Sequence, residues 1–156
     1  MKASIIAAVF VAGFAGGLIA AHQQDTSGLP AERVTGIGGV FIKAKDPKAL
    51  GTWYREKLGI AMPGGAPFGK FDWREAGEPG RPASTAWALF KSDSTYFAPS
   101  PSSFMIDYRV RNLDRMLAQL KALGVSVEGK VQEDANGKFA WIMDPEGNKV
   151  ELWEPK

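Results

Sequence analysis

The chain has 156 residues, 45% of them hydrophobic and 23% charged, and its formal net charge is +2. This charge is too small to favour binding to nucleic acid or to an anionic membrane surface. There is no cysteine, and the single histidine, His22, lies near the N-terminus. Disulfides, thiolate metal sites, cysteine nucleophiles and histidine-dependent catalytic triads are therefore excluded for the rest of the chain.

The N-terminal segment has the order of residues that is typical of a secretory signal. Lys2 is followed by an uncharged, largely apolar run over residues 3–21 that ends in small residues, and then by a polar stretch. We expect residues 1–21 to be a cleaved signal peptide, which would make the mature protein periplasmic or secreted. The same run is long enough to be a membrane anchor, so contact with a membrane is expected only if the segment stays uncleaved. Residues 22–33 are predicted to be a linker.

Residues 34–99 are predicted to form a first module of the order βαβββ. Asp46 followed by Pro47 is typical of a helix N-cap and first turn, and Gly59 is a suitable end for that helix. Glycines and prolines between residues 61 and 84 predict loops around one short strand. The strands of this module are expected at residues 34–43, 70–75, 85–91 and 95–98.

Residues 103–155 repeat this order as a second module. Asn112 can cap a helix with one clean apolar stripe that ends before Gly124. The distance from cap to glycine differs by one residue between the modules, which indicates an internal duplication. The pattern predicts the α+β class, with helices packed outside the sheet. The strands of this module are expected at residues 103–110, 125–131, 138–143 and 149–153, with an Asn136-Gly137 turn.

The last two strands flank Asp144-Pro145-Glu146-Gly147-Asn148, a composition that favours a reversing loop and therefore a β-hairpin. If the hairpin closes symmetrically, Trp141 and Trp153 share a face with Glu151. The run from Trp141 to Leu152 resembles the closing hairpin of the vicinal oxygen chelate superfamily. This superfamily groups glyoxalase I, extradiol dioxygenases, fosfomycin-resistance enzymes and bleomycin-binding proteins.

The resemblance implies that residues 34–156 form one glyoxalase-like domain, with two βαβββ modules whose curved sheets surround a concave cavity. In metal-dependent members, the first strands supply histidines and the last strands supply carboxylates. The matching positions here carry Gly39, Met105, the carboxylate-free run Thr95-Tyr96-Phe97, and Glu151. Glu151 alone would hold a divalent metal weakly, so we expect neither a catalytic metal nor another cofactor.

The resemblance also implies which side chains face the cavity. If Gly39, Met105 and Glu151 point inward, the charged residues two or four positions along the same strands do so as well. Inward charges must pair with one another, with water or with a ligand. The predicted ligand-binding residues are Lys43, Trp73, Met105, Asp107, Arg109, Trp141, Glu151 and Trp153.

Two functions fit these residues. The first is a binding protein that holds a small molecule in an aromatic cavity, and the loss of the metal positions favours it. The second is a metal-independent lyase or isomerase in which Glu151 or Asp107, with a pKa raised by burial, acts as general base. A third interpretation is a scaffold that only dimerises. We expect a homodimer; the modules would pair within one chain or be exchanged across the dimer.

Overall fold

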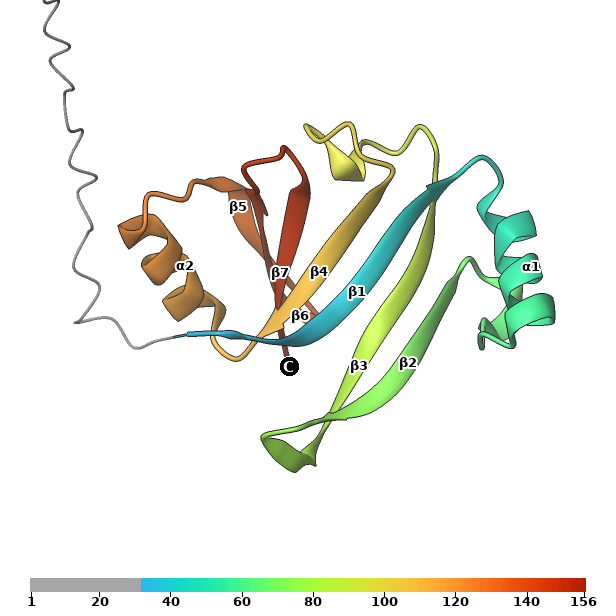
Figure 1. Cartoon of the computed structure of the whole chain (residues 1–156), viewed down its shortest axis with the longest axis horizontal. Helices are drawn as coiled ribbons and strands as arrows, with labels where there is room; N and C mark the ends of the chain where they lie inside the picture. Colours follow the sequence, from blue (N-terminus) through green and yellow to red (C-terminus); the bar gives the residue numbers. More distant parts are fainter. Residues whose placement is uncertain (1–31) are drawn as a thin grey trace, which may run out of the picture.

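The structure, a computed structural model, describes residues 32–156. The predicted signal peptide over residues 1–21 and all but the end of the predicted linker lie outside the described residues. In the described part, seven strands form one curved mixed sheet, and two α-helices lie at opposite ends of it (Figure 1). The α+β class is as predicted.

The elements follow the chain in this order: β1 (Val34–Ala44), α1 (Pro47–Leu58), the 3-10 helix η1 (Pro63–Gly65), β2 (Phe68–Glu75), β3 (Glu78–Lys91), the 3-10 helix η2 (Thr95–Phe97), β4 (Phe104–Val110), α2 (Leu113–Ala122), β5 (Val127–Asp134), β6 (Gly137–Met143) and β7 (Lys149–Pro155).

The sheet has two similar halves that meet at its centre. Its strand order is β2-β3-β1-β4-β7-β6-β5, and the central strands β1 and β4 pair antiparallel. Each central strand has a parallel neighbour on its outer side, β3 for β1 and β7 for β4. An antiparallel strand follows in each half, β2 next to β3 and β6 next to β7. This arrangement supports the predicted duplication.

Module two has the predicted βαβββ order, but module one has only three strands. The strand expected at residues 95–98 is wrong, because Thr95–Phe97 forms the 3-10 helix η2, in which the Ser94 hydroxyl accepts a hydrogen bond from the backbone N–H of Tyr96. The last strand of module one is therefore β3, and no described strand of module one corresponds to β5.

The loop predicted before residue 85 is also wrong, since β3 already begins at Glu78. The prolines and the glycine of this stretch had argued against a strand. Within this stretch, residues 82–84 and, across a bulge, Glu78 pair with β2, whereas pairing of β3 with β1 begins only at Ala86. A strand that is open on one side tolerates prolines, which lack an N–H for a second neighbour.

The helix boundaries are close to those predicted from the sequence. The Asp46 carboxylate accepts a hydrogen bond from the backbone N–H of Ala49 at 2.9 Å, and Gly59 ends α1 with a φ of 70°. The Asn112 side chain caps α2 in the same way, accepting from the N–H of Arg115 at 2.8 Å. These local contacts explain why spacing alone located both helices.

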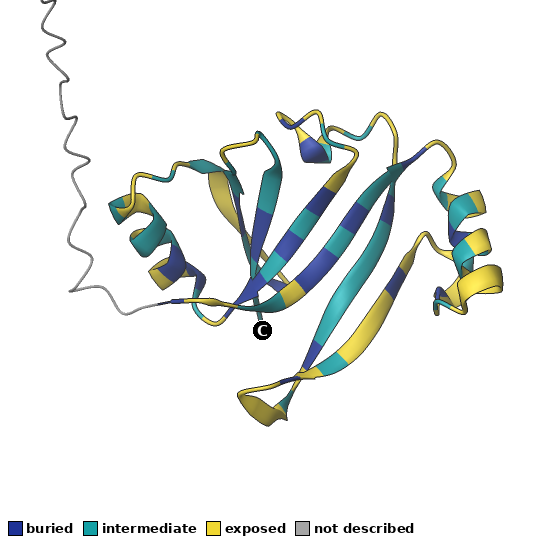
Figure 2. Ribbon diagram, in the orientation of Figure 1, coloured by how far each residue is buried: buried dark blue, intermediate teal, exposed yellow. Residues whose placement is uncertain are grey.

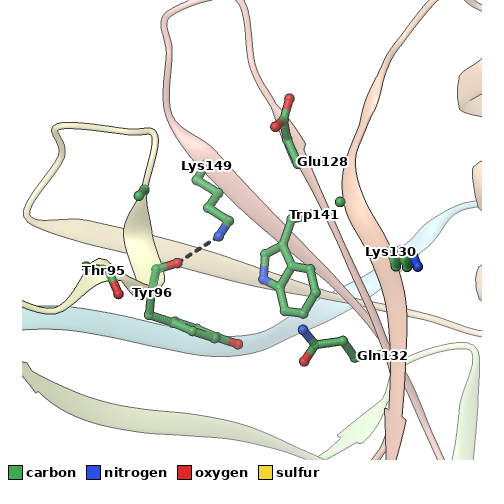
Figure 3. Close-up of a pocket in the computed structure, with 9 residues that line it drawn as sticks. Thr95, Tyr96, Glu128, Lys130, Gln132, Trp141 and Lys149 are labelled. Carbon is green, nitrogen blue, oxygen red and sulfur yellow. Dashed lines mark hydrogen bonds between the residues drawn. The ribbon is translucent and has the colours of Figure 1, made fainter.

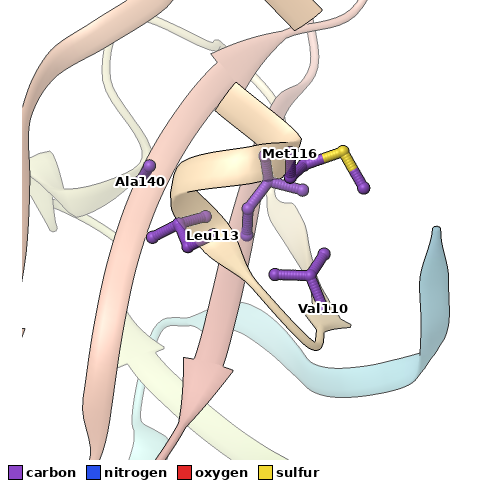
Figure 4. Packing of buried hydrophobic residues seen from close by; sticks show 5 residues of the cluster. Val110, Leu113, Met116 and Ala140 are labelled. Atoms are coloured by element: carbon purple, nitrogen blue, oxygen red, sulfur yellow. The ribbon is translucent and has the colours of Figure 1, made fainter. Parts of the chain in front are cut away.

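The helices cover one face of the sheet, and a cavity lies on the other. α2 packs on a buried cluster that includes residues of β4, β6 and β7 (Figure 4). The central strands β1 and β4 carry many of the buried residues, whereas β2 and β5 are largely exposed (Figure 2). The cluster under α2 consists of Val110, Leu113, Met116, Ala140 and Leu152.

The predicted linker ends in contact with the domain. The backbone N–H of Glu32 donates to the side chain of Gln119 in α2 at 3.0 Å, and its carboxylate accepts from the N–H of Arg111 at 3.2 Å. Glu32 is therefore part of the folded unit. Neither helix within residues 32–156 has the length and apolar character needed to cross a bilayer.

Candidate functional site

A cavity of about 410 Å³ lies on the concave face of the sheet and receives side chains from both modules. Small residues of β3, among them Ala86 and Ala88, leave space at one side, while Asp107 and Glu151 supply carboxyl groups from the centre. Its aromatic lining consists of Phe41, Phe68, Phe90, Tyr96, Phe139 and Trp153.

The two carboxyl groups are neighbours because Asp107 in β4 lies directly opposite Glu151 in the parallel strand β7. Both residues are buried, with 3% and 2% of their surface exposed. One oxygen of Glu151, Oε2, accepts hydrogen bonds from the Trp141 indole N–H at 2.7 Å and from the Tyr96 hydroxyl. Glu151 is therefore bonded by two neutral donors and not by a cation.

Asp107 is buried without such partners. Its Oδ1 atom has no hydrogen-bond partner in the structure, and a Cβ placed on Gly38 would come within 2.5 Å of Oδ2. Burial, and secondly the repulsion from Glu151, raises the pKa of Asp107 to about 8. Burial also raises the pKa of Glu151, but the bonds from Tyr96 and Trp141, and then the charge of Lys149, oppose this shift. Asp107 therefore keeps its proton at neutral pH while Glu151 serves as the acceptor.

The predicted residue Arg109 is turned towards another partner. Its guanidinium pairs with Glu75, the last residue of β2, at 3.3 Å, and lies 5.9 Å from the centre of the Trp153 ring. Glu75 also pairs with Arg111 at 3.1 Å. Arg109 thus connects the β2–β3 hairpin to the rim of the cavity and does not neutralise Glu151.

Four other predicted residues do not line the cavity, and one of them, Trp141, lines a neighbouring hollow instead. The Lys43 ammonium lies 5.0 Å from the centre of the Phe97 ring. Met105 is fully buried in a packed cluster with Phe41, Phe97 and Trp141. Trp73 donates to Thr85 at 2.9 Å. Its strand neighbour Phe71 contacts Trp87 on the helix side of the sheet, and strand alternation places Trp73 on that same side.

A second hollow of about 360 Å³ adjoins the first, between η2 and strands β5 and β6 (Figure 3). The Lys149 ammonium donates to the Tyr96 carbonyl at 2.7 Å and lies above the Tyr96 and Trp141 rings at 5.5 and 5.3 Å. Tyr96 lines both hollows. The Lys149 ammonium therefore lies over the faces of the two rings whose O–H and N–H groups bond Glu151.

Sequence reasoning missed Tyr96 as a partner of Glu151. It had placed Tyr96 in a strand, whereas η2 turns the residue over the end of the sheet and directs its hydroxyl to Glu151. The register of β6 and β7, which sets Phe139 opposite Trp153 and Trp141 opposite Glu151, agrees with the predicted hairpin. No spacing in the sequence pointed to the contact of Tyr96 with Glu151, because it joins residues of different modules.

The residues at the family's metal positions do not fit a metal ion. Gly39 and Met105 stand equally far before the helix caps Asp46 and Asn112, which confirms that they are equivalent. By the same spacing Phe41 corresponds to Asp107, and their strand partners Ala88 and Glu151 correspond to each other. Module one therefore offers a methyl group where module two has a carboxylate.

Within residues 32–156 there is no group of three or more histidine, cysteine, aspartate or glutamate side chains placed to hold a metal ion. In module one, the position equivalent to Glu151 is Ala88 and not the run at residues 95–97. Neither Ala88 nor that run offers a carboxylate as a metal ligand. The site chemistry available to these residues is that of the carboxyl pair and the aromatic rings.

Residues 39–153 match a family described as a glyoxalase-like domain. Among curated proteins, none matches the sequence. A variant of Streptomyces coelicolor methylmalonyl-CoA epimerase in complex with 2-nitronate-propionyl-CoA has a TM-score of 0.58 and 18% identity, covering 79% of this chain and 99% of that chain. Methylmalonyl-CoA epimerase from Mycobacterium tuberculosis gives a TM-score of 0.50 and 22% identity, covering 82% and 93%.

A glyoxalase/bleomycin resistance protein/dioxygenase superfamily member from Vibrio splendidus 12B01 gives a TM-score of 0.47 at 11% identity, covering 80% of this chain and 99% of that chain. At 18% and 22% identity, the likeness to the two epimerases concerns the fold.

Proposed function

The chain belongs to the glyoxalase-like domain family of the vicinal oxygen chelate superfamily, and from this premise we propose that it binds a small organic molecule in the concave cavity without a catalytic metal. One observation carries the proposal. The cavity has aromatic walls and a buried pair of carboxyl groups, Asp107 and Glu151, where metal-dependent relatives would need a set of metal ligands.

The composition of the cavity supports binding. Small-molecule sites are concave, mostly apolar, and contain a few polar groups that fix the orientation of the ligand. Here the aromatic rings supply the apolar surface, and the unpartnered Oδ1 of Asp107 supplies a buried polar atom that still lacks a partner. Such an atom costs free energy in the empty cavity, and a ligand that bonds to it removes that cost.

A proton-transfer reaction is the second candidate, and the different environments of the two carboxyl groups favour it. A lyase or isomerase would take a proton from a substrate carbon with the Glu151 carboxylate, while the protonated Asp107 donates its proton to the substrate. The raised pKa of Asp107, about 8, suits a group that is to donate a proton near neutral pH. Turnover of a bound ligand into product distinguishes this candidate from pure binding.

Native mass spectrometry of the protein purified without chelator tests the proposal. We expect a retained or added small molecule in the spectrum and far less than one equivalent of zinc, nickel, iron or manganese by elemental analysis. A stoichiometric metal whose removal abolishes ligand binding would contradict the proposal. The same spectrum gives the oligomer mass, for which we predict a homodimer.

A further inference from the structure

We propose that the ligand of this cavity is an organic cation with a flat, unsaturated body, held between the aromatic walls with its positive end on the Asp107–Glu151 pair. This inference rests on the proposed function, because it names the chemical class of ligand for the same cavity.

The charge of the cavity points to a cation. Glu151 is bonded by the neutral Tyr96 and Trp141, and Oδ1 of Asp107 has no partner. No salt bridge to either carboxyl group exists within residues 32–156. Buried carboxylates are normally paired with a positive group. A ligand cation would supply the pairing that the described part of the chain does not.

Two lysines at or beside the cavity have partners of their own. Lys70 lines the cavity, but its ammonium pairs with Asp72 at 3.0 Å on the exposed strand β2. Lys149 lines the neighbouring hollow, where its ammonium donates to the Tyr96 carbonyl and forms no salt bridge with Glu151. An anionic ligand would therefore meet two carboxyl groups and no free positive side chain among the residues that line the cavity.

The aromatic rings supply a second attraction for a cation. Phe90 and Tyr96 stack with ring centres 5.3 Å apart and planes inclined by 5°, and Phe139 and Trp153 stack at 6.3 Å and 6°. The first pair belongs to module one and the second to module two. The face of an aromatic ring attracts cations, more strongly where water is excluded. A flat cation can contact such rings while its charge reaches the carboxyl pair.

The geometry of the carboxyl pair favours a cation with more than one N–H group. Asp107 and Glu151 are opposite one another on adjacent strands, so their carboxyl groups present several oxygen atoms side by side. A planar group with two N–H donors, such as an amidinium, can bond to neighbouring carboxyl oxygens at the same time. On the side of module one, Ala86 and Ala88 offer only methyl groups, which suits an apolar ligand body.

Binding of a cation should be coupled to loss of a proton. A positive group beside Asp107 favours its ionised form, so the proton that burial keeps on this residue leaves when the ligand binds. The titratable groups near the carboxyl pair are the Tyr96 hydroxyl from η2 and Lys149 from β7, whose charge acts on Glu151, with Lys70 at the rim on β2. Affinity should therefore rise by up to about tenfold per pH unit below pH 8 and level off above it.

Three probes of the same shape test the charge preference: benzamidine, which is a cation, benzamide, which is neutral, and benzoate, which is an anion. Each is titrated into the purified full-length protein at pH 6, 7, 8 and 9 and followed by tryptophan fluorescence, since Trp153 lines the cavity. Calorimetry in two buffers with different ionisation enthalpies counts the protons released. We expect benzamidine to bind at least tenfold more tightly than benzamide, benzoate to bind most weakly, and benzamidine to release protons at pH 7.

Substitutions of Asp107 and Glu151 test whether the cation binds at the carboxyl pair. Asp107→Asn should remove the proton release and the pH dependence, and both Asp107→Asn and Glu151→Gln should lower the affinity for benzamidine at least tenfold without lowering that for benzamide. The exposed carboxylate of Asp114 on α2 is the matched control, and Asp114→Asn should bind like the unmodified protein.

The possible outcomes distinguish the cation preference from the proposed binding function. If benzamide or benzoate binds as tightly as benzamidine, the cation preference is wrong while the binding function stands. If benzamidine binds but Asp107→Asn and Glu151→Gln leave its affinity unchanged, the assignment to the carboxyl pair is wrong. If none of the three probes binds and native mass spectrometry also finds no ligand, both the cation preference and the proposed function are wrong.

Discussion

Asp107 occupies an environment that opposes its own charge. It is buried beside a second carboxyl group, and one of its oxygen atoms has no partner. The sequence predicted that inward charges pair with one another, with water or with a ligand. In the structure Arg109 pairs with Glu75, and Glu151 is bonded by Tyr96 and Trp141. The unpaired acid is therefore the residue whose removal is most informative about both stability and binding.

Asp107→Asn should make the fold more stable at neutral and alkaline pH. Between about pH 4 and pH 8 the folded chain keeps a proton on Asp107 that the unfolded chain has lost, so the free energy of unfolding falls as the pH rises through this range. Asparagine does not titrate, so the variant lacks this pH-dependent loss in the free energy of unfolding. We expect the variant to gain ~5 kcal/mol at pH 8 and almost nothing at pH 4.

Urea unfolding of both proteins at pH 4, 6 and 8 measures this difference. Asp93→Asn, at an exposed residue of the turn after β3, is the control and should change the free energy of unfolding little at any of these pH values. An Asp107→Asn variant that is equally destabilised at all three pH values would show that the carboxyl group is ionised in the fold.

Local sequence signals predicted both helices correctly, but they failed to predict the start of β3 and wrongly predicted a strand at residues 95–98. The caps at Asp46 and Asn112 are contacts between residues close in sequence, so their spacing is visible in the sequence. The start of β3 depends instead on its neighbour in the sheet, while the turn η2 is capped by the Ser94 hydroxyl, which accepts from the N–H of Tyr96. Residues 78–84 form a strand because β2 lies alongside them, in spite of their prolines.

The two helices should contribute unequally to stability. Leu113 at the start of α2 is 0% exposed and packs in the cluster of Figure 4, whereas Leu58 at the end of α1 is 60% exposed. Leu113→Ala should lower the free energy of unfolding by ~3 kcal/mol, because it leaves a cavity in a packed core.

Leu58→Ala is the matched control, with an expected change within about 0.5 kcal/mol. Urea unfolding followed by circular dichroism measures both variants. Equal losses for the two leucines would contradict the packing of α2 on the sheet.

For the whole molecule, the duplication and the final hairpin could be predicted, while the partners within the cavity could not. The spacing from helix cap to glycine recurs in both modules with a difference of one residue, and the hairpin places Trp141 opposite Glu151 through a short loop. The contacts of Glu151 with Tyr96 and of Arg109 with Glu75 join distant segments. They depend on how the modules meet, which no local pattern encodes.

Export is a prediction for the complete chain and rests on the uncharged run after Lys2. Expressed in a Gram-negative host, the protein should appear in the periplasm and lose about twenty residues, which fractionation and intact mass measure. Full-length protein in the membrane fraction would indicate an anchor instead. Full-length protein in the soluble cytosolic fraction would contradict both interpretations.

The six strands that the two modules share are arranged symmetrically, but the cavity they line is not symmetric. Where module two pairs Asp107 with Glu151, module one pairs Phe41 with Ala88 at the equivalent positions. Had both halves carried acids, a ligand could have entered in two orientations related by a half-turn with equal energy. With one polar and one apolar side, a ligand that has a single charged end can enter in only one of them. The cavity can therefore tell the two ends of its ligand apart.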